Sequence, residues 1–278
     1  MKEITAPSWE DFEKILGQLT SQRLEFQEQP FGSVVSNLRY RGQPNSCWHL
    51  ETSLDRSINQ QISLIEYFKL IQLAKPRLER LPERSWMIPT PEDYAGWLKS
   101  NRRPIVPRDG IEYFIYLRHH GFPSPLLDWT ASPYVAAFFA MRNPAREVEL
   151  VTVYAFLKDA GQGAMSDRGK PAIYEIDPDV IAHRRHFLQQ SSYTICAVAA
   201  GESSVYAKHE DAFGNSVITQ DLLWKINIPI SARPEFLAKL HEKKINSFYL
   251  FETEDSLLET LATDIFVLNL TDVTACAI

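Results

Sequence analysis

The residues best suited to chemistry gather in one stretch, 116–141, which reads YLRHHGFPSPLLDWTASPYVAAFFAM. It holds the adjacent histidines His119 and His120 and, shortly after them, Asp128. Imidazoles and carboxylates are the groups that exchange protons near neutral pH. Each also has a structural alternative, because Asp128 can pair buried backbone amides and either histidine can cap a helix. The cluster as a whole is the main candidate for a functional site.

The first half of this stretch predicts a helix with a sharp end. The apolar and aromatic residues of 111–117 have helical spacing, and Gly121 favours the left-handed conformation that follows many helices. Pro123 and Pro125 then prevent the helix from continuing. The two histidines are therefore expected on the last turn of a helix.

The second half predicts a short strand followed by a buried helix. Residues 126–130 are expected to be extended, and Thr130 or Ser132 can cap the next helix, with Pro133 at its favoured first position. The residues of 134–141 are apolar on all sides, which is typical of a buried helix. The aspartate is therefore expected on a core element rather than on a surface loop.

A second candidate lies early in the chain. Residues 33–41 read SVVSNLRYR and predict a strand that ends in a turn over residues 42–45, which places Arg41 at the strand end. A guanidinium group is always charged and offers a fork of donors that suits phosphate or carboxylate. The alternative for Arg41 is a structural salt bridge.

Composition restricts the class of protein. The chain has 278 residues, a formal net charge of -6 and a sequence pI of about 5.7, so no global positive field attracts nucleic acid. The three cysteines, Cys47, Cys196 and Cys276, are too few and too widely spaced for a disulfide framework or a zinc site. The N-terminus lacks the apolar core of a signal peptide, and no stretch is long enough to span a membrane, so we expect a cytoplasmic protein.

The remaining pattern predicts an α+β fold with a helical N-terminal half and a mixed or antiparallel sheet. Helices are expected over residues 9–19, 58–81 with an interruption at Pro76, 232–243 and 255–262, and strands over residues 149–157, 172–176, 192–199 and 222–230. The proline-rich residues 82–107 predict a loop or a small helical insertion. We therefore expect an N-terminal helix and loop over 1–32, one domain over 33–265 that contains this insertion, and a tail over 266–278.

Three motifs in this order resemble the FRG domain family, which takes its name from an aromatic-Arg-Gly step. They are Tyr40-Arg41-Gly42-Gln43, the run from His119 to Thr130 with Ser132-Pro133, and Arg185 with Gln189-Gln190. The resemblance covers roughly residues 34–261. Two positions depart from the family pattern: Ser191 stands where glycine is usual, and residues 252–255 replace an aspartate-rich run. The resemblance implies a bacterial or phage-borne protein that acts in defence or toxicity.

The same motifs are similar, more distantly, to the three-part layout of ADP-ribosyltransferases. By that resemblance Arg41 would bind a phosphate or ribose of NAD, with Gly42 as part of the cofactor-binding motif. Thr130 and Ser132 would supply hydroxyls of the nicotinamide pocket, and Gln189 would stand where those enzymes have a catalytic glutamate. Because glutamine carries no charge, Asp128, Glu175 or Glu202 would have to supply the carboxylate.

The predicted site is accordingly a nucleotide site with NAD as substrate and a protein or nucleic acid as acceptor. Its catalytic candidates are Asp128, His119 and Gln189, and its cofactor-binding candidates are Arg41, Gly42, Thr130, Ser132 and Arg185. No membrane partner is expected. No metal is expected either, since adjacent histidines point in different directions on a helix and the set lacks the usual ligand spacing.

Two other functions remain open at this stage. The first is a nucleotide- or nucleic-acid-binding module without catalysis, in which arginines contact phosphates and Trp129 or Tyr193 stacks on a base. Its arginines would be Arg41, Arg102, Arg103, Arg184 and Arg185. The second is hydrolysis by a histidine–aspartate pair, for which the sequence shows no nucleophile elbow.

Overall fold

The computed structural model describes residues 1–28, 36–80, 85–100, 106–158, 169–176, 184–200, 203–213 and 221–269. Arg102, Arg103, Glu202 and Cys276 lie outside the described residues, as do residues 33–35 of the expected first strand. No helix in the described ranges is both long and apolar enough to cross a membrane.

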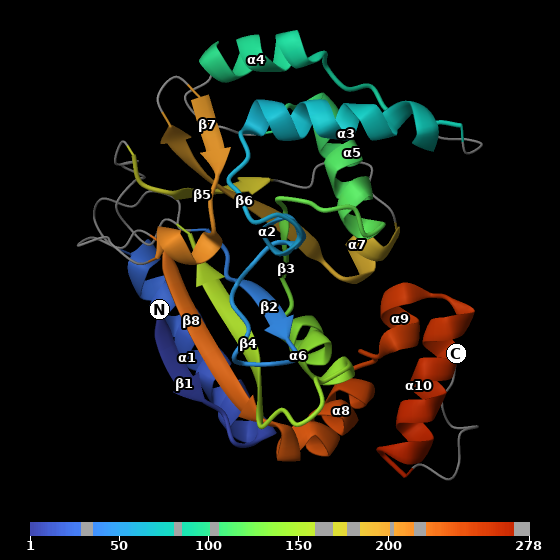
Figure 1. Cartoon of the computed structure of the whole chain (residues 1–278). Coiled ribbons are helices and arrows are strands. Elements are labelled where there is room, and N and C mark those ends of the chain that lie inside the picture. Colours follow the sequence, from blue (N-terminus) through green and yellow to red (C-terminus); the bar gives the residue numbers. More distant parts are fainter. Residues whose placement is uncertain are drawn as a thin grey trace.

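The centre of the molecule is a mixed, mostly antiparallel sheet of eight strands, which confirms the predicted α+β class (Figure 1). Its strands are β1 (Lys2–Thr5), β2 (Arg39–Gln43), β3 (Leu127–Thr130), β4 (Leu150–Leu157), β5 (Ala172–Ile176), β6 (Ser191–Ala200), β7 (Ser203–Tyr206) and β8 (Leu222–Pro229). They are ordered β1-β8-β4-β2-β3-β6-β5, with β7 paired to β6. Only the β1–β8 pair is parallel among the strand pairs described.

Ten α-helices and two short 3₁₀ turns pack around the described part of the sheet. The α-helices are α1 (Trp9–Gln27), α2 (Ser53–Ser57), α3 (Leu64–Leu78), α4 (Pro91–Ser100), α5 (Arg108–His119), α6 (Pro133–Arg142), α7 (Arg184–Leu188), α8 (Arg233–Glu242), α9 (Ser247–Phe251) and α10 (Glu254–Phe266). The 3₁₀ turns are η1 (His209–Ala212) and η2 (Ile230–Ala232). Helices α3, α4 and α5 cover one end of the molecule, whereas α1 lies beside β8 and α9 and α10 lie on the opposite side (Figure 1).

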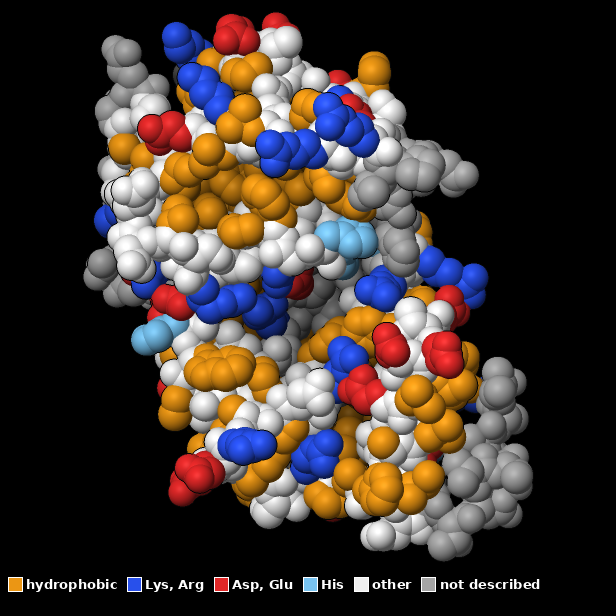
Figure 2. Space-filling model, turned by 45° about the vertical axis from the view of Figure 1, so that its right-hand side comes forward, with side chains coloured by type: hydrophobic (Ala, Val, Ile, Leu, Met, Phe, Trp, Pro, Cys, Tyr) orange, Lys and Arg blue, Asp and Glu red, His pale blue; other side chains and the backbone are white. Residues whose placement is uncertain are grey.

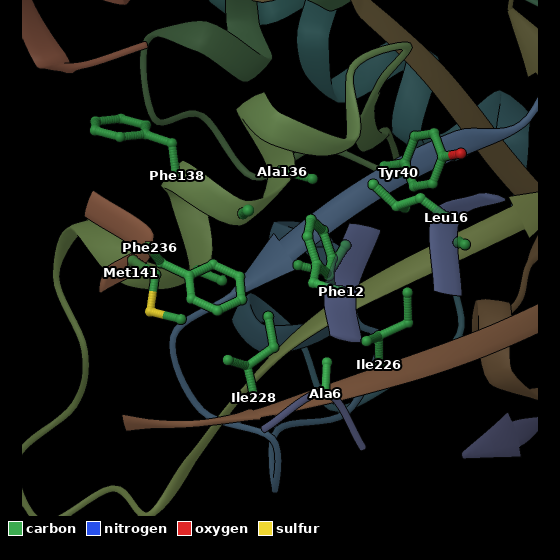
Figure 3. Packing of buried hydrophobic residues seen from close by; sticks show 14 of the residues in the cluster. Ala6, Phe12, Leu16, Tyr40, Ala136, Phe138, Met141, Ile226, Ile228 and Phe236 are labelled. Atoms are coloured by element: carbon green, nitrogen blue, oxygen red, sulfur yellow. The ribbon is translucent and has the colours of Figure 1, made fainter. Parts of the chain in front are cut away.

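The largest core forms where α1, α6 and α8 meet strands β2, β4 and β8. Phe12 of α1 lies among side chains from these elements, including Ala136, Ile228 and Phe236 (Figure 3). The predicted buried helix is confirmed as α6, in which six of ten residues are buried. This helix lies directly on β2, so packing in the core holds the aromatic-Arg-Gly step in place.

The sheet opens between β2 and β3. Strand β2 pairs with β4 over five residues, and β3 pairs with β6 over four, but β2 and β3 share only the position Tyr40–Thr130. Beyond that pair the two strands separate. The sheet therefore consists of two halves joined at one residue pair, and the separation leaves room for a cavity.

The predicted capping of the central stretch is confirmed. Helix α5 ends at His119, Gly121 follows with a φ of 81°, and the Phe122 amide donates to the Leu117 carbonyl, as expected for a glycine-terminated helix. Ser132 is the N-cap of α6, with its hydroxyl accepting from the Val135 amide.

Three predicted boundaries were wrong. Arg41 lies in the middle of β2, because Gly42 and Gln43 continue the strand opposite β4 instead of forming a turn. Pro76 lies inside α3, near its end, where its missing amide removes only one helical hydrogen bond. Helix α1 continues to Gln27.

The sequence pattern also missed the short elements β1, β7, α2, α7 and α9, since four or five residues carry little periodicity. Within residues 82–107, for which a loop or a small helical insertion was expected, the structure has the helix α4.

Candidate functional site

A cavity of about 380 Å³ lies at the point where β2 and β3 separate. Its lining residues are Tyr40, Arg41, Gly42, Pro44, Arg118, His119, Asp128, Trp129, Thr130, Phe139, Gln189 and Ser191. Figure 2 shows a hollow across the middle of one face, with basic, acidic and histidine side chains around it. The structure therefore brings together six of the eight predicted site residues, whereas Ser132 and Arg185 are not among the lining residues.

An ion cluster lies against this cavity. Arg118 Nε donates to Asp128 Oδ1 at 3.1 Å, and Arg118 Nη2 donates to Asp128 Oδ2, so the pair is bidentate. Arg41 Nη1 lies 3.7 Å from the same oxygen, Asp128 Oδ2. Arg118 was not among the predicted site residues, although it directly precedes the two histidines in the sequence and lies on the last turn of α5.

The cluster carries one net positive charge, since two guanidinium groups surround one carboxylate. Burial raises the pKa of Asp128, but attraction to Arg118 and Arg41 and the hydrogen bond from Arg118 outweigh it and hold that pKa below its ordinary value. The carboxylate is thus ionised at neutral pH. Its side chain is 34% exposed, so a ligand in the cavity can reach it.

Arg41 spans the opening in the sheet. Its Nη1 donates to the backbone carbonyl of Asp128 at 2.9 Å and so takes the place of a strand-to-strand hydrogen bond. Its Nε is buried without a hydrogen-bond partner in the described part of the chain. Burial lowers the pKa of Arg41 to about 10, with Asp128 opposing and Arg118 adding to the effect, so the group remains charged at neutral pH.

Gly42 allows α6 to lie against β2. A Cβ atom at this position would stand 1.9 Å from the Ala136 carbonyl oxygen and 2.6 Å from the Ala140 amide nitrogen. The neighbouring Tyr40 is buried in the main core. The three residues of the motif thus have distinct roles. Tyr40 packs in the main core, Arg41 forms a hydrogen bond across the opening in the sheet, and Gly42 leaves room for α6 to contact β2.

Comparison with known protein families agrees with this motif. Residues 36–149 match the model of the FRG domain. This part of the chain is an FRG domain. A search of curated proteins and a search of solved structures found no significant match. The matched part of the FRG domain supplies the ion cluster, whereas Gln189 and Ser191 come from the chain beyond it.

His119 lines the cavity and forms a hydrogen bond with Tyr193 of β6. Its Nε2 is 2.8 Å from the hydroxyl of Tyr193, and that hydroxyl is also 3.2 Å from Nδ1 of His186 on α7. Burial lowers the pKa of both histidines, with Asp128 opposing the effect for His119, so both are neutral at pH 7. Neither Tyr193 nor His186 was predicted as a site residue.

The other predicted site residues contact groups within the protein. Thr130 Oγ1 donates to the Gln189 carbonyl at 2.7 Å and accepts from the Ser132 amide. Gln189 Nε2 donates to the Leu250 carbonyl at 3.2 Å. The guanidinium group of Arg185 lies over the Phe251 ring at 5.4 Å. These contacts tie β3, α7 and α9 together on one side of the cavity.

A metal ion has no evident site in the described ranges, where no group of three or more His, Cys, Asp and Glu side chains is placed to hold one. The polar groups of the lining residues are guanidinium, carboxylate, imidazole, amide and hydroxyl. Such a set can bind an anion, balance a developing positive charge and accept a proton.

Proposed function

We propose that the FRG domain binds an anionic nucleotide in the cavity between β2 and β3, and that NAD is its substrate. The observation that carries this proposal is the Arg118–Asp128–Arg41 cluster on the cavity wall. Arginine forks favour phosphate oxygens, and the cavity volume of about 380 Å³ lies within the usual range for small-molecule sites.

The same cluster suits cleavage of the bond between nicotinamide and ribose. In that reaction nicotinamide leaves with the bonding electron pair, and positive charge develops on the ribose carbon. An ionised carboxylate close to that carbon stabilises the charge, whereas the arginines hold the diphosphate. Asp128 is ionised and partly exposed, and is therefore our candidate for this role rather than the uncharged Gln189.

A second candidate function is nucleotide binding without turnover. It is favoured by the bidentate contact that already occupies both oxygens of Asp128. Base stacking on Trp129 or Tyr193 is not part of either proposal, because these side chains are only 2% and 1% exposed.

Binding and turnover of NAD by the purified protein distinguish the two functions. Titration calorimetry would measure affinity for NAD and ADP-ribose, and chromatography would follow nicotinamide release. We expect Arg41→Lys to weaken binding about 10- to 100-fold, since loss of a charged hydrogen bond costs roughly 1.5–3 kcal/mol. Arg77→Lys is the matched control, because Arg77 is an exposed arginine of α3 and does not line the cavity.

Asp128→Asn separates binding from chemistry. It keeps the size of the side chain but removes its charge, so we expect retained or tighter binding of NAD and no nicotinamide release. Binding without release by the parent protein would favour the non-catalytic alternative. If the folded parent protein binds neither NAD nor ADP-ribose, the nucleotide proposal is wrong.

A further inference from the structure

The hydroxyl of Tyr193 joins two histidines from different elements. Tyr193 on β6 is directly opposite Asp128 on β3, so both side chains emerge on the same face of the sheet. There the hydroxyl meets Nε2 of His119 at 2.8 Å and Nδ1 of His186 at 3.2 Å. His186 stacks on the Tyr193 ring, with an interplanar angle of 24°.

The protons of the hydrogen-bonded series His119–Tyr193–His186 can be assigned by counting donors. A tyrosine hydroxyl has one proton, so it can donate to only one of the two histidines. Neutral histidine intrinsically prefers the form with its proton on Nε2. Only one arrangement places a proton on Nε2 of both histidines and lets the Tyr193 hydroxyl accept one hydrogen bond and donate another. In it His119 Nε2–H donates to Tyr193, and Tyr193 donates to His186 Nδ1.

We propose that Tyr193 and His186 are positioning residues that fix His119 with a bare Nδ1 available to a ligand in the cavity. His119 lines the cavity, and Nε2 is occupied by Tyr193, which leaves Nδ1 as its remaining polar atom. A bare imidazole nitrogen accepts a hydrogen bond or a proton from a hydroxyl or amine. The ligand is thus expected to present such a donor beside its anionic part.

The series His119–Tyr193–His186 also provides a route for a proton. When Nδ1 of His119 takes a proton from an attacking hydroxyl, Nε2–H can pass its own proton to Tyr193, which passes its proton to Nδ1 of His186. His119 then ends neutral with its proton on Nδ1, Tyr193 remains a phenol, and His186 becomes the cation. A cation on His119 is disfavoured by the burial of its ring and by Arg118, whereas Asp128 opposes both effects. This catalytic part rests on the proposed NAD-consuming function, whereas the assignment of the protons does not.

Nitrogen-15 NMR of the histidine rings tests the assignment without any need for turnover. His119→Gln and His186→Gln identify the two rings in the spectrum. At pH 7.5 we expect both to carry their proton on Nε2. In Tyr193→Phe the His119 ring should show a mixture of tautomers and faster exchange of its Nε2 proton. Tyr113→Phe is the matched control, since it removes another buried tyrosine hydroxyl from the same helix as His119.

The pH titration of His119 adds a second readout. The charged or titratable groups around its ring are Arg118 on its own helix, His120 at the C-cap of that helix, Asp128 on β3, Tyr193 on β6 and His186 on α7. We expect the apparent pKa of His119 to change in Tyr193→Phe and to stay unchanged in Tyr113→Phe.

The outcomes separate this inference from the proposed function. A His119 ring with its proton on Nδ1, or one that is unaffected by Tyr193→Phe, would overturn the assignment. ADP-ribose added to the parent protein should shift the Nδ1 resonance of His119. If the tautomers are as assigned but ADP-ribose produces no shift, the positioning stands and the nucleotide proposal fails. If NAD is turned over, the acid limb of the pH profile of nicotinamide release should move in Tyr193→Phe but not in Tyr113→Phe.

Discussion

Replacement of Gly42 by alanine tests why the aromatic-Arg-Gly step ends in glycine. The added Cβ would lie 1.9 Å from the Ala136 carbonyl oxygen, whereas ordinary contacts begin at 3.4 Å. Helix α6 would therefore have to move by about 1.5 Å (3.4 − 1.9) from β2. Both nearest atoms belong to the backbone of α6, so no side-chain rotation can relieve the overlap.

This displacement should be costly. Overpacking of a core costs about 1–3 kcal/mol when side chains can adjust, and here the buried face of α6 moves as a unit, so we expect a loss of about 3–4 kcal/mol. A total stability of about 5–15 kcal/mol is usual for proteins, so the variant should still fold. Its Tm should fall by roughly 6–12 °C.

Urea unfolding followed by tryptophan fluorescence, with a thermal scan by circular dichroism, measures both quantities. Gly17→Ala is the matched control, because a Cβ at Gly17 in α1 meets no atom within 4 Å. Alanine should raise stability there by about 0.5–1 kcal/mol, since glycine is unfavourable inside a helix. If Gly42→Ala unfolds at the same urea concentration as the parent protein, close contact between α6 and β2 is not the reason for the glycine.

Two further predictions concern buried groups. Ser132→Ala removes the N-cap of α6 and should lower the free energy of unfolding by about 1 kcal/mol in urea, with an unchanged midpoint contradicting the capping role. Burial lowers the pKa of His209 to about 3, so this ring stays neutral in the fold while the unfolded chain takes up a proton below about 6.5. Stability is therefore intact above pH 6.5 and should fall by up to about 5 kcal/mol as the pH drops towards 3. Urea unfolding across this pH range should show a shallower decline in His209→Gln but not in His49→Gln, whose side chain is 72% exposed.

Local chemistry was enough to predict the elements that carry the site. The end of α5, the N-cap of α6 and the burial of α6 depend on glycine, serine, proline and apolar residues that are close together in the chain. Their preferences act over one or two helical turns, and the structure confirms them. The α+β class and the longer strands β4, β6 and β8 were predictable for the same reason, because each contains enough residues to show a pattern.

Local preference was insufficient where pairing with a distant strand determines the conformation. The Gly-Gln-Pro-Asn run has the composition of a turn, yet Gly42 and Gln43 continue β2 because β4 provides hydrogen-bond partners for them. This places Arg41 inside a strand, next to an opening in the sheet. A sequence pattern cannot show that β2 and β3 share a single residue pair, since the separation depends on which other strands each one joins.

What the sequence determined by itself was the inventory of the site: the arginine, the histidines, the aspartate and the capped elements that hold them. The tertiary structure decided their partners. Arg118 joins Asp128 because α5 ends above β3, and Tyr193 reaches His119 because β6 pairs with β3 in the register that sets Tyr193 opposite Asp128. Charge and hydrogen-bond partners depend on distances of a few ångströms between segments far apart in the chain, and only packing of the sheet and helices fixes those distances.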